Sequence, residues 1–261
     1  MYSSIIMNEN PIKIFDSHFH IIDPSFPIYE NQGFTPEPFT TRDYLSQISP
    51  YNLAGGAIVS GSFQKQDQSY LINALEKLGS NFVGVTQLLA DTPDETILAL
   101  NSSGVRALRF NLKRGGSEDI SKITSFASRV YELARWHIEL YIDSIDLDGL
   151  YSTITSLPSV SIDHLGLSKE GFPTLLKLAE LGVKVKATGF GRIDFDPSTA
   201  ITDLYKANPE SLMFGTDLPS TRAARPFKDS DISLIIDKLG NTGAAQVLFN
   251  NAYEFYHKKN T

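Results

Sequence analysis

The chain of 261 residues contains no cysteine. This single absence excludes disulfide bonds, thiolate metal ligands and thiol nucleophiles. Long apolar runs are missing as well, because no stretch approaches the roughly 20 consecutive apolar residues that a membrane-spanning helix needs. The first ten residues lack the basic and apolar segments of a signal peptide. We therefore expect a cytoplasmic protein without a membrane partner.

Positive charge is also scarce. The chain has 23 Lys and Arg residues against 30 Asp and Glu residues, and its formal net charge is −7. Binding to nucleic acid needs clustered Lys and Arg to neutralise phosphates, so no nucleic-acid partner is expected. The composition leaves a local basic pocket open, and it indicates nothing about the oligomeric state.

Strand and helix patterns alternate eight times along the chain. The first predicted strand lies within 12–23, and the others cover 54–60, 82–89, 105–112, 137–144, 160–166, 183–189 and 212–218. Helices are predicted at 41–48, 67–78, from 91–95 to Gly104, at 117–135 as the longest, and at 146–156, 172–181, 197–206, 229–239 and 242–257. This alternation implies a parallel α/β sheet with right-handed crossovers.

Eight such units in about 250 residues favour a closed (β/α)8 TIM barrel. An open doubly wound sheet is the alternative, but the dinucleotide-binding pattern Gly-x-Gly-x-x-Gly does not follow the first strand. No break in composition divides the chain. We therefore predict a single domain over residues 1–261.

The first strand carries polar residues at alternate positions. Asp16, His18 and His20 share one face of the strand, because successive side chains point to opposite faces. Each imidazole brings a polar nitrogen that needs a partner. The pair therefore favours a binding site over two hydrogen-bonded core histidines. Asp16 lies one step deeper, and we expect it to support the histidines rather than to react.

Further polar residues stand near the carboxyl ends of the later strands, where β/α barrels build their sites. They are Ser60, Arg109, Arg114, Tyr141, His164, Lys186, Arg192, Asp217, Arg222 and Arg225. Three imidazoles and a carboxylate would suit zinc, whereas several arginines favour an anionic ligand such as a carboxylate. The residues alone leave both interpretations open. Asp217 suits a general base that takes a proton from water.

Five motifs in a fixed order resemble a known superfamily. They are Asp-Ser-His-Phe-His-Ile-Ile-Asp-Pro at 16–24, Arg-Phe-Asn-Leu at 109–112, Ile-Asp-His-Leu-Gly at 162–166, Lys-Ala-Thr-Gly at 186–189 and Phe-Gly-Thr-Asp-Leu-Pro at 214–219. The chain resembles the amidohydrolase superfamily, in the amidohydrolase 2 branch, and within it the lactonases similar to 2-pyrone-4,6-dicarboxylate hydrolase. The resemblance runs from the first strand to the last helix.

The resemblance implies a distorted barrel in which four residues surround the scissile bond, namely His18, His20, His164 and Asp217. Metal-dependent members of the superfamily add a histidine at the end of the fifth strand, where this chain has Tyr141. The metal-independent lactonases resembled here have a tyrosine at this place. The resemblance therefore implies no cofactor, or at most a weakly bound divalent metal such as zinc on the same four residues.

In the metal-independent lactonases, arginines hold the carboxylates of the substrate. Arg109, Arg114 and Arg192 match these arginines by motif, although the spacing from Arg109 to Arg114 is one residue shorter. The expected substrate-binding set is Arg109, Arg114, Tyr141, Arg192, Ser60 and Arg222.

The expected reaction is hydrolysis of a small-molecule lactone: a carboxylated pyrone, a muconolactone-like compound or a sugar lactone. Asp217 would take a proton from the attacking water, while His18, His20 and His164 would donate hydrogen bonds to the carbonyl oxygen. Two alternatives stay open. One is a zinc-dependent decarboxylase or hydrolase of the same superfamily, and the other is a non-catalytic protein that binds carboxylates or sugar acids.

Overall fold

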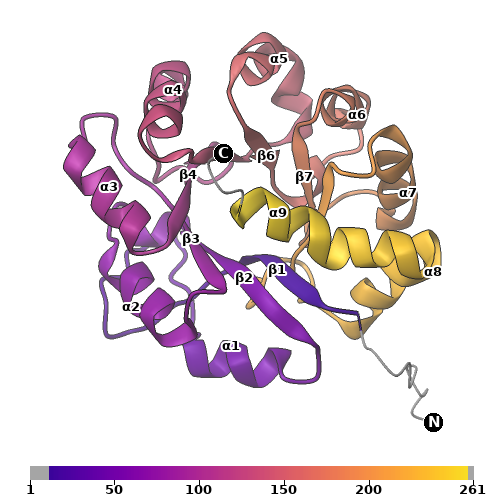
Figure 1. The fold of residues 1–261 in the computed structure, drawn as a ribbon, viewed down its shortest axis with the longest axis horizontal. Coiled ribbons are helices and arrows are strands. Elements are labelled where there is room, and N and C mark those ends of the chain that lie inside the picture. Colours follow the sequence, from indigo (N-terminus) through magenta and orange to yellow (C-terminus); the bar gives the residue numbers. More distant parts are fainter. Residues whose placement is uncertain (1–11, 258–261) are drawn as a thin grey trace.

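The computed structural model describes residues 12–257. Residues 1–10, on which the expected absence of a signal peptide depends, and both ends of the predicted domain lie outside the described residues. Eight parallel strands form one sheet whose order follows the sequence, with helices around it (Figure 1). They are β1 (Ile14–Phe19), β2 (Leu53–Val59), β3 (Phe82–Thr86), β4 (Val105–Asn111), β5 (His137–Tyr141), β6 (Val160–Ile162), β7 (Lys184–Ala187) and β8 (Leu212–Phe214). The predicted (β/α)8 TIM barrel is confirmed.

The helices follow the strands close to the predicted positions. They are α1 (Thr41–Ile48), α2 (Ser69–Leu78), α3 (Asp94–Ser102), α4 (Ile123–Ala134), α5 (Leu147–Ser156), α6 (Phe172–Glu180), α7 (Pro197–Ala207), α8 (Asp229–Ala245) and α9 (Asn251–His257). The prediction that 117–135 is the longest helix was wrong. A short 3-10 turn capped by Asp119 delays the start of α4, and α8, with 17 residues and a kink at Gly240, is longer.

Each helix buries one apolar stripe against the strands. In α2, Tyr70, Leu71, Ala74 and Leu75 are buried, a spacing of three and four residues that keeps them on one face. The strands are buried on both faces, and all six residues of β1 are buried. The inward positions of the strands are therefore where any polar side chain must find its partner inside the barrel.

The barrel closes between β8 and β1 through the residues that follow β8. The backbone N–H of Asp217 donates to the carbonyl of His18, and the N–H of His20 donates to the carbonyl of Leu218, each over 2.7 Å. These two bonds fix the backbone of both histidines and of Asp217 against one another. The seam of the barrel and the expected site therefore coincide.

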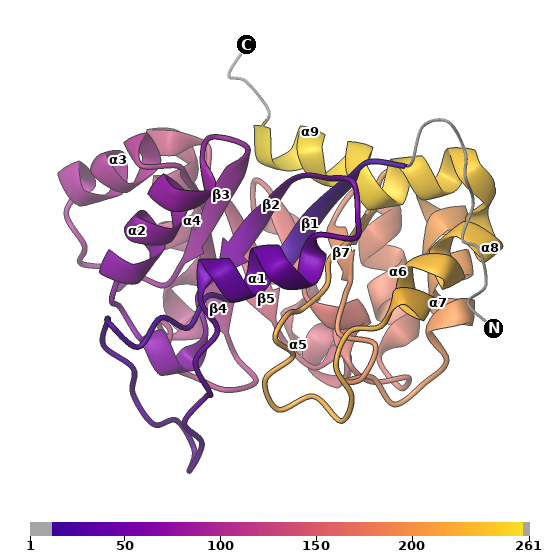
Figure 2. The same cartoon turned by 90° about the horizontal axis from the view of Figure 1, so that it is seen from below.

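The two ends of the barrel are covered differently. Helix α9 lies across the end where the strands begin (Figures 1 and 2), and Tyr256 of α9 stacks on Phe15 of β1. The loop 24–39 projects at the opposite end (Figure 2). Among residues 12–257, we find no helix with the length and apolar character needed to cross a membrane.

Candidate active site

Most of the expected site residues meet around a cavity of about 30 Å³ beyond the carboxyl ends of the strands. Its lining includes His20, Arg109, Arg114, Tyr141, His164, Arg192 and Arg222. His18 and Asp217 are fully buried, and each contacts residues that line the cavity. The structure therefore brings most of the predicted site residues together at one end of the barrel.

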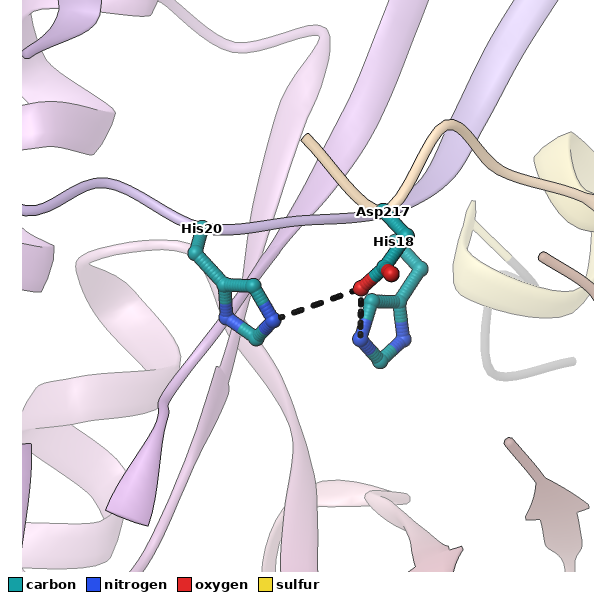
Figure 3. A group of neighbouring side chains, drawn as sticks. All are labelled: His18, His20 and Asp217. Carbon is teal, nitrogen blue, oxygen red and sulfur yellow. Dashed lines mark ion pairs between the residues drawn. The ribbon is translucent and has the colours of Figure 1, made fainter. Parts of the chain in front are cut away.

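His18, His20 and Asp217 form a compact group (Figure 3). Oδ1 of Asp217 lies 3.8 Å from Nε2 of His20 and 4.0 Å from Nε2 of His18. These separations exceed direct hydrogen bonds, and Nε2 of His18 has no hydrogen-bond partner among the described residues. A buried nitrogen and a buried carboxylate facing each other without a bond leave a position for a third polar group, such as water or a substrate oxygen.

The bond made by His20 fixes the position of its proton. Nδ1 of His20 lies 2.7 Å from the carbonyl oxygen of Val59, and a carbonyl oxygen only accepts hydrogen bonds. Burial lowers the pKa of His20 well below its usual value of 6.5, so the ring is neutral at pH 7. Neutral His20 therefore carries its proton on Nδ1 and presents a lone pair on Nε2, and it does not fit the expected role of a donor.

His164 lies at the start of the loop after β6. Its Nδ1 is 2.6 Å from Oγ1 of Thr188, and a hydroxyl group either donates or accepts. Burial, together with the charges of His18 and Arg192, lowers the pKa of His164 well below 6.5. The ring packs against the edge of Tyr141, with centroids 5.1 Å apart. If the Thr188 hydroxyl donates, Nε2 of His164 carries the proton and serves as a donor.

Two of the expected substrate arginines are paired with buried carboxylates. Arg109 donates to Asp163 over 2.7 Å. Arg192 donates to both carboxylate oxygens of Asp217, from Nε over 2.6 Å and from Nη2 over 3.2 Å. Charge-assisted pairs such as these, of which the Arg192–Asp217 pair is bidentate, are directional and hold both groups in place. Arg109 and Arg192 therefore position the aspartates, although both line the cavity.

Arg114 and Arg222 have no carboxylate partner within residues 12–257. The guanidinium of Arg222 donates to Asn31 and lies over the ring of Phe34, 4.4 Å from its centroid. Arg114 donates to the side chain of Gln32 over 3.4 Å. Both arginines are thus held by the loop 24–39 while their charge stays uncompensated. They are cations that line the cavity without a carboxylate partner among the described residues.

Ser60 and Arg225 follow the carboxyl ends of β2 and β8, as predicted, but neither lines this cavity. The hydroxyl group of Ser60 is 2.6 Å from the hydroxyl of Tyr70, and its carbonyl accepts a bond from Arg109, so Ser60 supports the site from behind. Arg225 pairs with both oxygens of Asp231 and does not line this cavity.

A network of buried charges lies beneath the histidines. Nζ of Lys186 donates to Glu139 over 2.5 Å, and it lies 3.6 Å from Asp163. Burial opposes ionisation of Glu139, yet Lys186 holds the pKa of that carboxyl at about 2. Glu139 is also bonded by His137 and Tyr256. Glu139 is not among the residues predicted from the sequence, although a charged residue in the middle of a buried strand was a signal for it.

Asp16 supports the site, as its depth in β1 predicted. Its carboxylate accepts bonds from the backbone N–H and hydroxyl of Thr216, over 2.8 and 2.6 Å, and from the hydroxyl of Tyr44 over 3.1 Å. Burial raises the pKa of Asp16 to about 6, against the effect of these bonds. Because Thr216 precedes Asp217, these bonds hold the segment that carries the expected base.

Comparison with known proteins identifies the family. A family model described as amidohydrolase matches residues 15–258, which is nearly the whole chain. The chain belongs to the amidohydrolase family. The resemblance that the five motifs indicated is thereby confirmed.

Two hydrolases are similar in sequence to this chain. This amidohydrolase is 26% identical over 167 residues to a 2-pyrone-4,6-dicarboxylate hydrolase of Comamonas testosteroni, a match covering 60% of this chain and 52% of that protein. It is 26% identical over 242 residues to a 4-sulfomuconolactone hydrolase of Rhizobium radiobacter, covering 85% and 80% respectively. The first match thus spans about half the length of the relative.

The same barrel occurs in solved structures. A "probable 2-pyrone-4,6-dicarboxylic acid hydrolase" of Acinetobacter baumannii superposes with a TM-score of 0.80 at 20% sequence identity, covering 93% of this chain and 98% of the other. At this identity the similarity establishes the shared fold.

Because some amidohydrolases depend on a metal, we consider whether His18, His20 and Asp217 could bind a divalent ion. One ligand atom each of His18, His20 and Asp217 lie within 4.8 Å of one another, so donors are present. Their surroundings fit poorly, because Asp217 is already bonded twice by Arg192. Nζ of Lys186 also lies 3.4 Å from Nδ1 of His18. A divalent cation bound to Asp217 and His18 would therefore be repelled by the positive charges of Arg192 and Lys186, which already contact these two residues.

Proposed function

We propose that this amidohydrolase opens a lactone by adding water to its carbonyl, with Asp217 as general base and without a tightly bound metal. The observation that carries the proposal is the gap between the Asp217 carboxylate and the facing Nε2 atoms of His18 and His20, 3.8 to 4.0 Å wide. The names of two relatives, both lactone hydrolases, support the reaction class. The reaction is assigned to one barrel domain acting in the cytoplasm.

The attacking water fits between Asp217 and His20. Both groups accept hydrogen bonds there, since neutral His20 presents a lone pair on Nε2. A water that donates one hydrogen to each turns an oxygen lone pair toward the substrate carbonyl. As the new C–O bond forms, Asp217 takes one proton from the water. The ester C–O bond then breaks, and Asp217 returns the proton to the leaving oxygen.

Charge that develops on the carbonyl oxygen needs donors. His18 and His164 provide them when Nε2 carries the proton, and their rings lie with centroids 4.7 Å apart. Their depressed pKa values keep both rings neutral, so they act as hydrogen-bond donors rather than as acids. Donors fixed in a buried site stabilise the oxyanion more than water does.

The proposed substrate is an anionic lactone. Arg114 and Arg222 contribute two charges without a carboxylate partner in the described chain, and both line the cavity. The names of the relatives contain carboxylate and sulfonate groups. We assign recognition of such a group to these two arginines, because guanidinium forks match planar and tetrahedral anions.

The test is a panel of lactones: a carboxylated pyrone, a muconolactone, a sulfonated muconolactone and a neutral aldonolactone. We expect ring opening of the anionic members and loss of turnover, with binding retained, in Asp217→Asn. No hydrolysis of any member, with binding of their carboxylates intact, would instead support a non-catalytic carboxylate-binding protein. Equal turnover in Asp217→Asn would remove this residue from the base role.

A further inference from the structure

Two groups compete for Nδ1 of His18, and they require opposite proton positions. Nζ of Lys186 and Oδ1 of Asp163 both lie 3.4 Å from Nδ1. A lysine ammonium only donates hydrogen bonds, whereas a carboxylate only accepts them. If Lys186 bonds to Nδ1, neutral His18 carries its proton on Nε2. If Asp163 bonds to Nδ1, the proton moves there and Nε2 presents a lone pair.

The contacts of Lys186 favour the first arrangement. Its side chain is fully buried, and three acceptors surround its three N–H bonds: Glu139 at 2.5 Å, His18 at 3.4 Å and Asp163 at 3.6 Å. Nζ of Lys186 meets Nδ1 of His18 with hydrogen-bond geometry, whereas Oδ1 of Asp163, at the same distance of 3.4 Å, accepts a bond only if the proton lies on Nδ1. Each buried donor of Lys186 thus has one acceptor to face.

The opposite side of the ring favours the same arrangement. Nε2 of His18 faces the carboxylate of Asp217 at 4.0 Å. A proton on Nε2 directs a donor toward that carboxylate, whereas a lone pair would oppose it. Both flanks of the His18 ring therefore select the same tautomer.

The geometry points to Lys186, held by Glu139, as a positioning residue that keeps the proton of His18 on Nε2 and thereby makes His18 an oxyanion donor instead of a metal ligand. His20 and Asp217 present acceptor atoms to the gap, whereas His18 with its proton on Nε2 presents a donor, which a metal ion cannot use as a ligand. A histidine that binds a metal through one ring nitrogen usually donates the proton of its other nitrogen to a carboxylate or carbonyl oxygen. Asp163, 3.4 Å from Nδ1 of His18, occupies the position of such a carboxylate. The inference rests on the proposed function for the role of the donor.

The tautomer of His18 is directly measurable. In protein with ¹⁵N-labelled histidine, we expect the wild type to show a protonated Nε2 and an unprotonated Nδ1 for His18, and the reverse for His20. The resonances are assigned with His18→Gln and His20→Gln. A proton on Nδ1 of His18 in the wild type would overturn the inference, and this measurement needs no folded Lys186 variant.

The second test removes the buried pair as a unit. Lys186→Met alone leaves Glu139 charged and buried, so Lys186→Met/Glu139→Gln is the variant of choice. We expect Nδ1 of His18 to become protonated toward Asp163, and zinc affinity in calorimetry to rise by roughly 10-fold or more, the range typical of groups that orient metal-bound histidines. A folded variant with unchanged zinc affinity would overturn the inference.

Lys184→Met is the matched control. Lys184 lies two residues earlier on β7, and its Nζ donates to the carbonyl of Glu210 over 2.7 Å at the other end of the barrel. This variant should keep wild-type zinc affinity and the wild-type His18 tautomer. Neither readout involves turnover, so failure to hydrolyse any lactone would refute the proposed function while leaving this inference to its own test.

Discussion

The two ends of the barrel differ in the size of their cavities and in the residues that line them, and the larger cavity is not the one with the candidate catalytic residues. The end covered by α9 has a cavity of about 1190 Å³ between described residues, and Arg106, Arg135 and Lys184 line it. The opposite end, with the histidines and Asp217, has a cavity of about 30 Å³. The larger space is therefore not where the residues suited to lactone chemistry converge.

What distinguishes the smaller cavity is how its polar groups are arranged. The guanidinium of Arg106, at the large cavity, donates to backbone and side-chain oxygens of Asn101, which anchors it to the protein. At the small cavity, Nε2 of His18 is buried, has no hydrogen-bond partner within residues 12–257 and faces the carboxylate of Asp217. Convergent buried groups that lack partners indicate chemistry better than open volume does.

The largest expected effect comes from the base. Asp217→Asn should lower kcat for an anionic lactone by about 10²–10⁴-fold, because the amide cannot take the proton from water. Glu210→Gln, the same kind of change at the large cavity, should leave kcat unchanged. Steady-state kinetics of both folded variants decide the matter. A larger loss of kcat in Glu210→Gln than in Asp217→Asn would indicate that the reaction takes place at the end covered by α9 instead.

Loss of one oxyanion donor should have the next largest effect. His164→Ala should lower kcat by roughly 10²–10³-fold with little change in KM, since the bond forms fully only as the carbonyl oxygen gains charge. The measurement is kcat and KM on the best substrate of the panel. A change confined to KM would show that His164 binds the ground state instead.

Removal of a substrate arginine should have an intermediate effect. Arg222→Met should lower kcat/KM for an anionic lactone by roughly 10–100-fold, the loss of one charge-assisted hydrogen bond, and should affect a neutral lactone less. Arg106→Met is the matched control, because Arg106 also donates to an asparagine but lies at the other end. Equal effects of Arg222→Met on charged and neutral lactones would contradict anion recognition.

The smallest expected effect is on stability at acidic pH, and here we expect the two ends of the barrel to behave alike. Burial lowers the pKa of His164 at one end and of His137 at the other below 6.5. The unfolded chain then binds protons that the folded protein excludes, so the free energy of unfolding falls as pH drops below about 6.5.

Each histidine contributes up to about 1.4 kcal/mol per pH unit to this slope. His164→Asn and His137→Asn should each flatten it in denaturant unfolding between pH 6.5 and 5. An unchanged slope in both variants would contradict burial in the neutral form.

The sequence predicted the barrel, and it predicted which polar residues gather at one end of it, because both depend on local patterns. Strand and helix periodicity indicated the eight units, and residues after each strand indicated the site. Partner choice could not be read in this way. Arg109 and Arg192 are paired with aspartates more than 20 residues away in sequence, and the proton of His20 is fixed by the carbonyl of Val59 on another strand. Such roles depend on tertiary contacts.

If Asp217 activates water without a tightly bound metal, kcat should not depend on the amount of metal bound per chain. We propose to measure this dependence directly. Protein stripped with chelator and then supplied with graded zinc is assayed on an anionic lactone, with the metal content of each sample determined by elemental analysis. We expect the same kcat in stripped and zinc-supplied samples. A kcat that rises in proportion to bound zinc, and vanishes on its removal, would contradict it.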